Sequence, residues 1–102
     1  MIVFKELQDL ISREGADAWT GVYQLLEAGG CLDPEYLRNT SEGNVAEAVK
    51  RADRMDLDEV YTWLTWILRG ERFSDGLFET SIENGTLSRL LQRGYELEQE
   101  SV

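Results

Sequence analysis

The sequence predicts an all-α fold, a compact bundle of five or six short helices around a central buried helix at residues 57–69. Apolar residues recur at offsets of three and four along most of the chain, and residues that start and stop helices separate these segments. The run at residues 60–68 is apolar on nearly every side, which is typical of a helix surrounded by protein. A length of 102 residues suits one domain, so we expect residues 1–102 to form a single helical domain.

Two amphipathic segments form the N-terminal part of the chain. The first ends near Gly15, and its apolar residues have helical spacing: Val3, Phe4, Leu7, Leu10 and Ile11. The second covers residues 17–28 and ends at Gly29, and its apolar stripe consists of Trp19, Val22, Tyr23 and Leu26. Asp33 followed by Pro34 is typical of a helix start, which predicts a short helical turn after it.

The middle of the chain holds a loop and the central helix. Residues 39–44 form the longest polar stretch and predict a loop, and the small apolar residues that follow predict a helix over about 45–55. Asp56 and Glu59 have the spacing of a capping box, which places the start of the central helix there. The run at 60–68 is also rich in β-branched and aromatic residues, so a β-strand is the alternative for it. The acidic cap favours the helix.

The C-terminal third predicts two further helices. A short one begins at Ser74 or Asp75 and runs to Glu83, before a turn at Asn84-Gly85. Thr86 caps the last helix, whose apolar residues are Leu87, Leu90, Leu91 and Tyr95. We expect the acidic end of this helix, residues 96–100, to fray, because carboxylates at a helix C-terminus oppose the macrodipole.

Charge is the most informative part of the composition. Asp and Glu total 20 against 10 Lys and Arg, histidine is absent, and the formal net charge is −10. This charge repels nucleic acid and attracts cationic surfaces, so we expect no direct binding of nucleic acid. Without histidine the chain lacks the commonest general base and metal ligand, and it has no glycine-rich phosphate loop. We therefore expect no enzymatic activity, no cofactor and no bound metal.

The single cysteine, Cys31, cannot form an internal disulfide, which fits a reducing cytoplasm. We expect it to be a small core residue, with a reactive thiol as the alternative. No apolar run approaches the ~20 residues that span a membrane, and the N-terminus has no signal-peptide pattern. We expect a cytoplasmic protein that does not contact a membrane, as a monomer or a small homo-oligomer.

The acidic residues are concentrated in the first part of the chain. Residues 1–59 hold 13 acids and 6 bases, a net charge of −7, whereas residues 60–102 hold 7 acids and 4 bases, a net charge of −3. This division predicts an acidic face that inhibits a nucleic-acid-handling protein by occupying its basic surface, as a DNA mimic would. The candidate partner-binding residues are Glu42, Glu47, Asp53, Asp56, Asp58, Glu59 and Trp63.

Three other interpretations stay open at this point. The acidic charge could serve solubility alone. The chain could be an accessory, antitoxin or immunity-type protein that binds its partner through an apolar helical surface around Trp63. The chain could also be a minor enzyme or a ligand-binding domain, and an enclosed pocket with two converging carboxylates would favour the enzyme. Asp56 and Asp58 have the spacing of a calcium loop without its glycine or its final glutamate, so a helix start explains them better.

The segment after the central helix carries a motif to which we assign structural roles. Gly70 lets the chain leave the central helix, and Gly76 permits a close approach of the backbone. Arg69 and Arg72 are expected to bind helix-end carbonyls or carboxylates, and Phe73 to re-enter the core. The motif residues are Arg69, Gly70, Glu71, Arg72, Phe73, Gly76, Asn84 and Gly85.

This motif resembles that of a family of small bacterial proteins classed as a domain of unknown function. The C-terminal halves of that family resemble Arg-Gly-Glu-Arg-Phe-x-x-Gly, a short helix, an Asn-Gly turn and a leucine-rich helix, found here over residues 69–93. The resemblance covers about the last third of the chain and implies no catalytic residues. In size and charge the chain is also similar to anti-CRISPR proteins, which are small, acidic, single-domain inhibitors.

Overall fold

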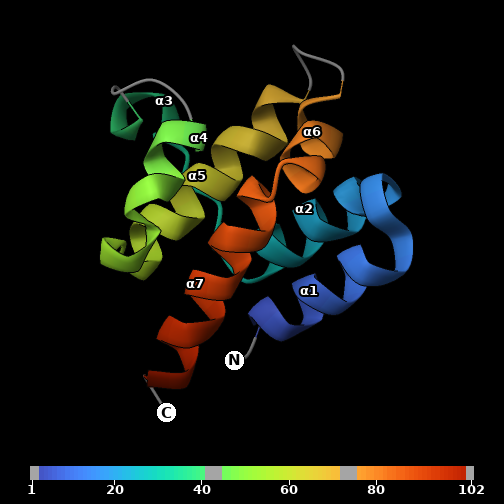
Figure 1. Ribbon diagram of the computed structural model, residues 1–102, viewed down its shortest axis with the longest axis horizontal. Helices are drawn as coiled ribbons and strands as arrows, with labels where there is room; N and C mark the ends of the chain where they lie inside the picture. Colours follow the sequence, from blue (N-terminus) through green and yellow to red (C-terminus); the bar gives the residue numbers. More distant parts are fainter. Residues whose placement is uncertain (1–2, 41–44, 72–75, 101–102) are drawn as a thin grey trace.

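The computed structural model describes residues 3–40, 45–71 and 76–100, and all of the regular structure in them is helical. The elements in chain order are α1 (Val3–Glu14), the 3₁₀ helix η1 (Gly15–Ala18), α2 (Trp19–Ala28), α3 (Tyr36–Asn39), α4 (Val45–Ala48), the 3₁₀ helix η2 (Val49–Arg54), α5 (Leu57–Gly70), α6 (Leu77–Glu83) and α7 (Thr86–Glu100). Figure 1 shows how they are arranged. The all-α prediction is confirmed, and the strand alternative for residues 60–68 is wrong because all of them lie in α5.

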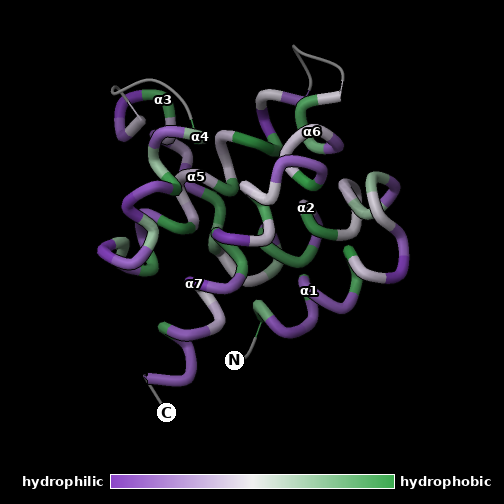
Figure 2. Tube along the Cα trace, in the orientation of Figure 1, coloured by the Kyte–Doolittle hydropathy of each residue, from purple (hydrophilic) through white to green (hydrophobic). Residues whose placement is uncertain are grey.

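Helix α5 is the central helix of the bundle, as predicted. It begins after Asp56, whose Oδ1 accepts a hydrogen bond from the backbone N–H of Glu59 at 2.8 Å, one half of the predicted capping box. Val60, Leu64 and Ile67 are at most 1% exposed. Because apolar side chains cover nearly all sides of α5, helices α3, α6 and α7 can all pack against it. Figure 2 shows hydrophobic stretches in α2 and α5, whereas the C-terminal part of α7 is mostly hydrophilic.

Helices α1 and α7 pack against each other, and this contact joins the two ends of the chain (Figure 1). Gly94 permits the close approach, because a Cβ at that position would lie 2.3 Å from Cε1 of the buried Phe4 ring. Near the end of α7, the carboxylate of Glu98 accepts hydrogen bonds from the backbone N–H groups of Val3 and Phe4, each at 3.1 Å. The expectation that residues 96–100 fray is wrong, because this carboxylate meets the positive end of a second helix.

Two expectations about helix ends also need correction. Residues 45–55 form one turn of α-helix followed by η2, and the backbone at Arg51 leaves the helical range (φ −110°, ψ 20°). The small buried side chains there, Ala48 and Ala52, offer little apolar surface to stabilise a longer helix. The last helix begins at Thr86, but Asn84 supplies the cap: its Oδ1 accepts a hydrogen bond from the backbone N–H of Thr86 at 3.0 Å, while the Thr86 side chain is buried.

The segment after α5 confirms one assigned role and corrects another. Gly70 ends α5 as expected, and the close approach occurs here, because a Cβ would lie 2.5 Å from Cδ2 of Leu77. Gly76 instead has a positive φ of +92° with open space around it, so its role is conformational. Glu71 accepts hydrogen bonds from the backbone N–H groups of Gly76 at 2.9 Å and Phe78 at 3.0 Å, and thereby caps α6.

Arg69 does not bind a carbonyl or a carboxylate among the described residues. Its guanidinium carbon lies 5.6 Å from the centre of the Tyr23 ring, a cation–π contact. Its Nε atom is buried and has no hydrogen-bond partner in the described part of the chain. The roles assigned to Arg72 and Phe73, and the predicted helix start at residues 74–75, lie outside the described residues.

Candidate functional site

A cleft of about 430 Å³ lies between the end of α3 and the first turns of α5, and predicted partner-binding carboxylates line it. We name it the acidic cleft, and its lining residues are Asn39, Thr40, Arg51, Asp56, Asp58, Glu59, Thr62 and Trp63. One wall comes from α3 and the residue that follows it, and the other comes from α5 and its cap. The packing of α3 against α5 therefore creates the concavity.

The carboxylates of the acidic cleft gather at the start of α5 for a local reason. The unpaired backbone N–H groups and the macrodipole stabilise negative charge at a helix N-terminus. Asp56, Asp58 and Glu59 are exposed, and none of them forms an ion pair with another residue in the described ranges. Asp53, three residues before Asp56, is exposed and is likewise without an ion pair to a described residue. Arg51 contributes a cation at the same cleft.

Trp63 lines the acidic cleft but is buried. It is 5% exposed, and its ring centroid lies 5.9 Å from that of Trp66, the more exposed of the two. The sequence left open whether Trp63 belongs to the core or to an interface, and the structure places it in the core. Since α5 is covered on nearly all sides, residue spacing alone could not tell which of the two tryptophans faces outward.

Asp33 connects α3 to α5 and so holds one wall of the acidic cleft in place. Its Oδ2 accepts hydrogen bonds from Thr62 Oγ1 at 2.7 Å and Asn39 Nδ2 at 2.8 Å, and its Oδ1 accepts one from the backbone N–H of Glu35 at 2.9 Å. Desolvation is the largest single influence and raises the pKa of Asp33, but these hydrogen bonds and a nearby arginine charge together outweigh it, so the pKa is lowered. Sequence reasoning identified Asp33 only as a helix start.

Of the other predicted partner-binding residues that the structure describes, Asp53 and Glu47 are not among those that line this cleft. Glu47, on α4, forms an ion pair with Lys50, in which Oε1 and Nζ lie 3.2 Å apart. Glu42 lies outside the described residues. The structure therefore brings together Asp56, Asp58 and Glu59 around one concavity.

Cys31, expected to be a small core residue, is half-buried and packs against the hydrophobic core. Its Sγ lies 3.5 Å from the carbonyl oxygen of Gly29, and it lines a cleft of about 300 Å³ together with Tyr61 and Asp58. Burial raises the pKa of the Tyr61 phenol, and a hydrogen bond with Cys31 raises it further.

Within the described ranges, no group of three or more Cys, Asp or Glu side chains could hold a metal ion.

The fold and the cleft together define a small all-helical domain with an acidic, concave surface. The chain belongs to DUF6508, a family of unknown function whose family model matches residues 19–100. The match begins at the first residue of α2 and leaves α1 outside it. No curated protein and no solved structure matches the chain. The expectation of a family without an assigned function is confirmed, whereas the motif and the likeness to anti-CRISPR proteins stay predictions. Among the described helices, none has the length and apolar character needed to cross a membrane.

Proposed function

We propose that this protein is a non-enzymatic binding protein that inhibits a nucleic-acid-handling partner by occupying its basic surface. The observation that supports the proposal is the set of exposed carboxylates around the acidic cleft: Asp56, Asp58 and Glu59 form no ion pair with another described residue. In a chain of net charge −10, a concavity lined by these three carboxylates and one arginine, Arg51, concentrates negative potential. Such a potential accelerates the encounter with a cationic partner.

The chemistry of the cleft suits a surface that normally holds DNA or RNA. Carboxylates and phosphates both accept charge-assisted hydrogen bonds from arginine and lysine, so a basic groove can bind either. The hydrogen bonds of Asp33 to Thr62 and Asn39 brace the α3 wall before any partner arrives. A braced wall loses less conformational freedom on binding, which favours affinity.

The alternative, an accessory or immunity-type protein with an apolar interface, has less support. Its expected anchor, Trp63, is buried. Leu37 on α3 is 71% exposed and is the one large hydrophobic side chain in the described ranges that is exposed. Single exposed hydrophobic residues are normal on protein surfaces, so Leu37 does not by itself define an interface.

The test is partner capture at two ionic strengths with matched charge variants. The immobilised protein is incubated with a bacterial lysate at about 0.15 M and about 1 M salt, where the Debye length falls from about 8 Å to about 3 Å. The variant Asp58→Asn/Glu59→Gln removes two charges from the acidic cleft. The variant Glu79→Gln/Glu83→Gln removes the same charge from exposed positions on α6.

We expect one nucleic-acid-binding protein to be captured at the lower salt, released at the higher salt and displaced by duplex DNA. The cleft variant should lose this partner, and the α6 variant should keep it. Equal losses with the two variants would mean that total charge, and not the cleft, governs binding. If the amount of captured partner changes neither with the salt concentration nor on addition of duplex DNA, the proposal itself is contradicted.

A further inference from the structure

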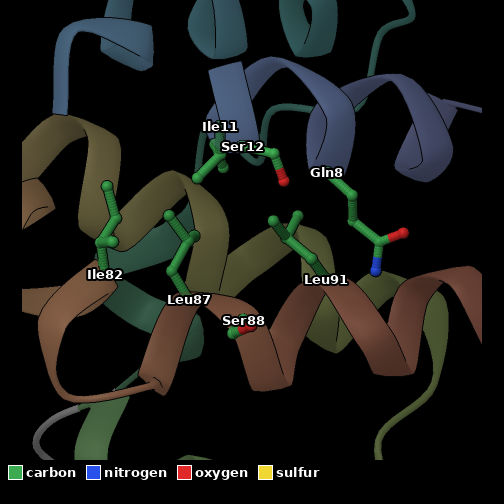
Figure 3. Close-up of a pocket in the computed structure, with 7 residues that line it drawn as sticks. All are labelled: Gln8, Ile11, Ser12, Ile82, Leu87, Ser88 and Leu91. Atoms are coloured by element: carbon green, nitrogen blue, oxygen red, sulfur yellow. The ribbon is translucent and has the colours of Figure 1, made fainter. Parts of the chain in front are cut away.

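A second concavity lies between α1 on one side and α6 and α7 on the other (Figure 3). Its volume is about 280 Å³, and we name it the neutral groove, lined by Gln8, Ile11, Ser12, Ile82, Leu87, Ser88 and Leu91. Both α1 and α6 pack against α7, and the groove is the space that this arrangement leaves. None of its lining residues lines the acidic cleft, so its chemistry is independent of the proposed function.

The inner surface of the neutral groove is apolar. Leu87 and Leu91 on α7 are each 2% exposed, and Ile11 and Ile82 at the sides are half-buried. Figure 3 shows these four side chains converging from three helices on one space. An apolar molecule placed there would remove apolar surface from water, both its own and that of the groove.

The polar groups at the rim are uncharged and available for hydrogen bonds to a ligand. Although 29% of all residues are charged, no Asp, Glu, Lys or Arg is among the residues that line the groove. The hydroxyls of Ser12 and Ser88 form no hydrogen bond with another described residue, and Figure 3 shows the Ser12 oxygen directed into the space between α1 and α7. The side-chain nitrogen of Gln8 reaches the Gln92 oxygen only at 3.5 Å, the limit of a hydrogen bond.

We propose that the neutral groove binds a small uncharged molecule that has an apolar body and one hydroxyl, amide or N–H group. The apolar body lies on Leu87 and Leu91, and the polar group exchanges a hydrogen bond with Ser12 or Ser88. The net charge of −10 repels an anion, and no lysine or arginine in the groove lining offsets that repulsion. A cation would find no carboxylate in the lining with which to form an ion pair. Pockets that bind small molecules have volumes of about 300 Å³ or more, and the neutral groove, at about 280 Å³, is at the lower end of this range. The ligand is therefore no larger than a bicyclic aromatic molecule or a short-chain alcohol.

Indole is a suitable probe, because it combines an apolar bicyclic body with one N–H donor, and indole-3-carboxylate is its anionic counterpart. Each is titrated into the ¹⁵N-labelled chain, and the backbone amide shifts are followed by NMR. We expect indole to produce saturable shifts confined to α1, α6 and α7, and indole-3-carboxylate to bind at least tenfold more weakly. Shifts that do not saturate, shifts spread over the whole surface, or equal binding of the two probes would overturn the proposal.

Two variants locate the site. Ser88→Phe places an aromatic ring at the rim and should abolish indole binding, and Ser12→Ala/Ser88→Ala should weaken it at least threefold. Thr20→Ala, at an exposed position on α2, is the control and should bind indole like the natural chain. If Ser88→Phe does not fold, the alanine pair decides the question, and indole binding unchanged by that pair contradicts the proposal.

Discussion

The carboxylate of Glu98, in the last turn of α7, accepts hydrogen bonds from the backbone N–H groups of Val3 and Phe4, 95 and 94 positions earlier in the chain. The first N–H groups of a helix have no partner within the helix, so this carboxylate satisfies two donors of α1 that would otherwise need water. The ring of Phe4 also stacks on that of Tyr61 in α5, with ring centroids 5.7 Å apart and ring planes 11° apart. The two ends of the chain therefore meet on the central helix.

Removing the charge of Glu98 should destabilise the fold. We expect Glu98→Gln to lower the free energy of unfolding by about 1–2 kcal/mol and Glu98→Ala by about 2–3 kcal/mol, because hydrogen bonds to a buried carboxylate are stronger than neutral ones. Urea unfolding measures the loss, and hydrogen exchange of the Val3 and Phe4 amides should accelerate. The exposed Glu100 on the same helix is the matched control, and an equal effect of Glu100→Gln would show that charge alone matters.

Gly94 on α7 tests the packing of α7 against α1, and Gly21 on α2 provides the comparison. A Cβ at Gly94 would lie 2.3–2.6 Å from atoms of the buried Phe4 ring, which cannot move aside, so Gly94→Ala should lower the free energy of unfolding by about 2 kcal/mol or more. A Cβ at Gly21 would meet the end of the half-buried Leu10 side chain at 2.7 Å, which can move. Gly21→Ala should therefore be neutral, or stabilising by up to about 1 kcal/mol through helix propensity. Thermal unfolding of both variants provides the comparison, and a stable Gly94→Ala variant would mean that α1 and α7 are further apart.

Helix α6 should depend on Glu71, which lies before it in the chain. Glu71→Ala removes the hydrogen bonds to the N–H groups of Gly76 and Phe78, and we expect it to cost about 1–2 kcal/mol of stability, the usual loss for a helix cap. Hydrogen exchange should become faster in α6 before it does so in α5. The substitution Glu79→Gln, within α6 but exposed, should have little effect on either measurement. Identical exchange in the two variants would argue against the cap.

Asp33 should make stability depend on pH at the acidic end of the scale. Its pKa in the folded protein is below the ordinary value of 3.8, so it binds a proton more weakly when folded than when unfolded. The stability that Asp33 contributes is therefore present above pH 3.8. It is lost as the pH falls below 3.8 and passes through the pKa that Asp33 has in the folded protein.

The variant Asp33→Asn lacks this titrating group. At neutral pH it should be less stable than the natural chain by about 1–2 kcal/mol, because it loses hydrogen bonds to a charged acceptor. The difference should shrink in urea unfolding series recorded at successively lower pH below 3.8. Asp17→Asn, at an exposed position in η1, is the control, and a difference for Asp33→Asn that does not change with pH would contradict the prediction.

Local patterns predicted the helices well where one face of the helix is buried and its ends are marked by capping residues. The spacing of Asp56 and Glu59 located the start of α5, and Gly15 and Gly70 marked the ends of α1 and α5 correctly. The same reasoning failed at residues 96–100. The carboxylate of Glu98 is unfavourable at the C-terminus of its own helix, but it accepts hydrogen bonds from the N-terminus of α1, which is far away in the sequence. Local patterns could not decide whether Trp63 is buried or exposed, because a helix that is apolar on nearly all sides has no pattern that distinguishes its buried face from its exposed face.

The sequence by itself determined the all-helical class, the position of the central helix and the acidic charge, because these depend on residue type and on periodicity over a few turns. Only the tertiary structure decided which carboxylates share a surface, since this depends on how α3 packs against α5. It also decided the partners of Asp33 and Glu98 and the existence of a groove between α1, α6 and α7. These features join residues tens of positions apart, and hydrogen bonds and packing at that range leave no periodic signal in the chain.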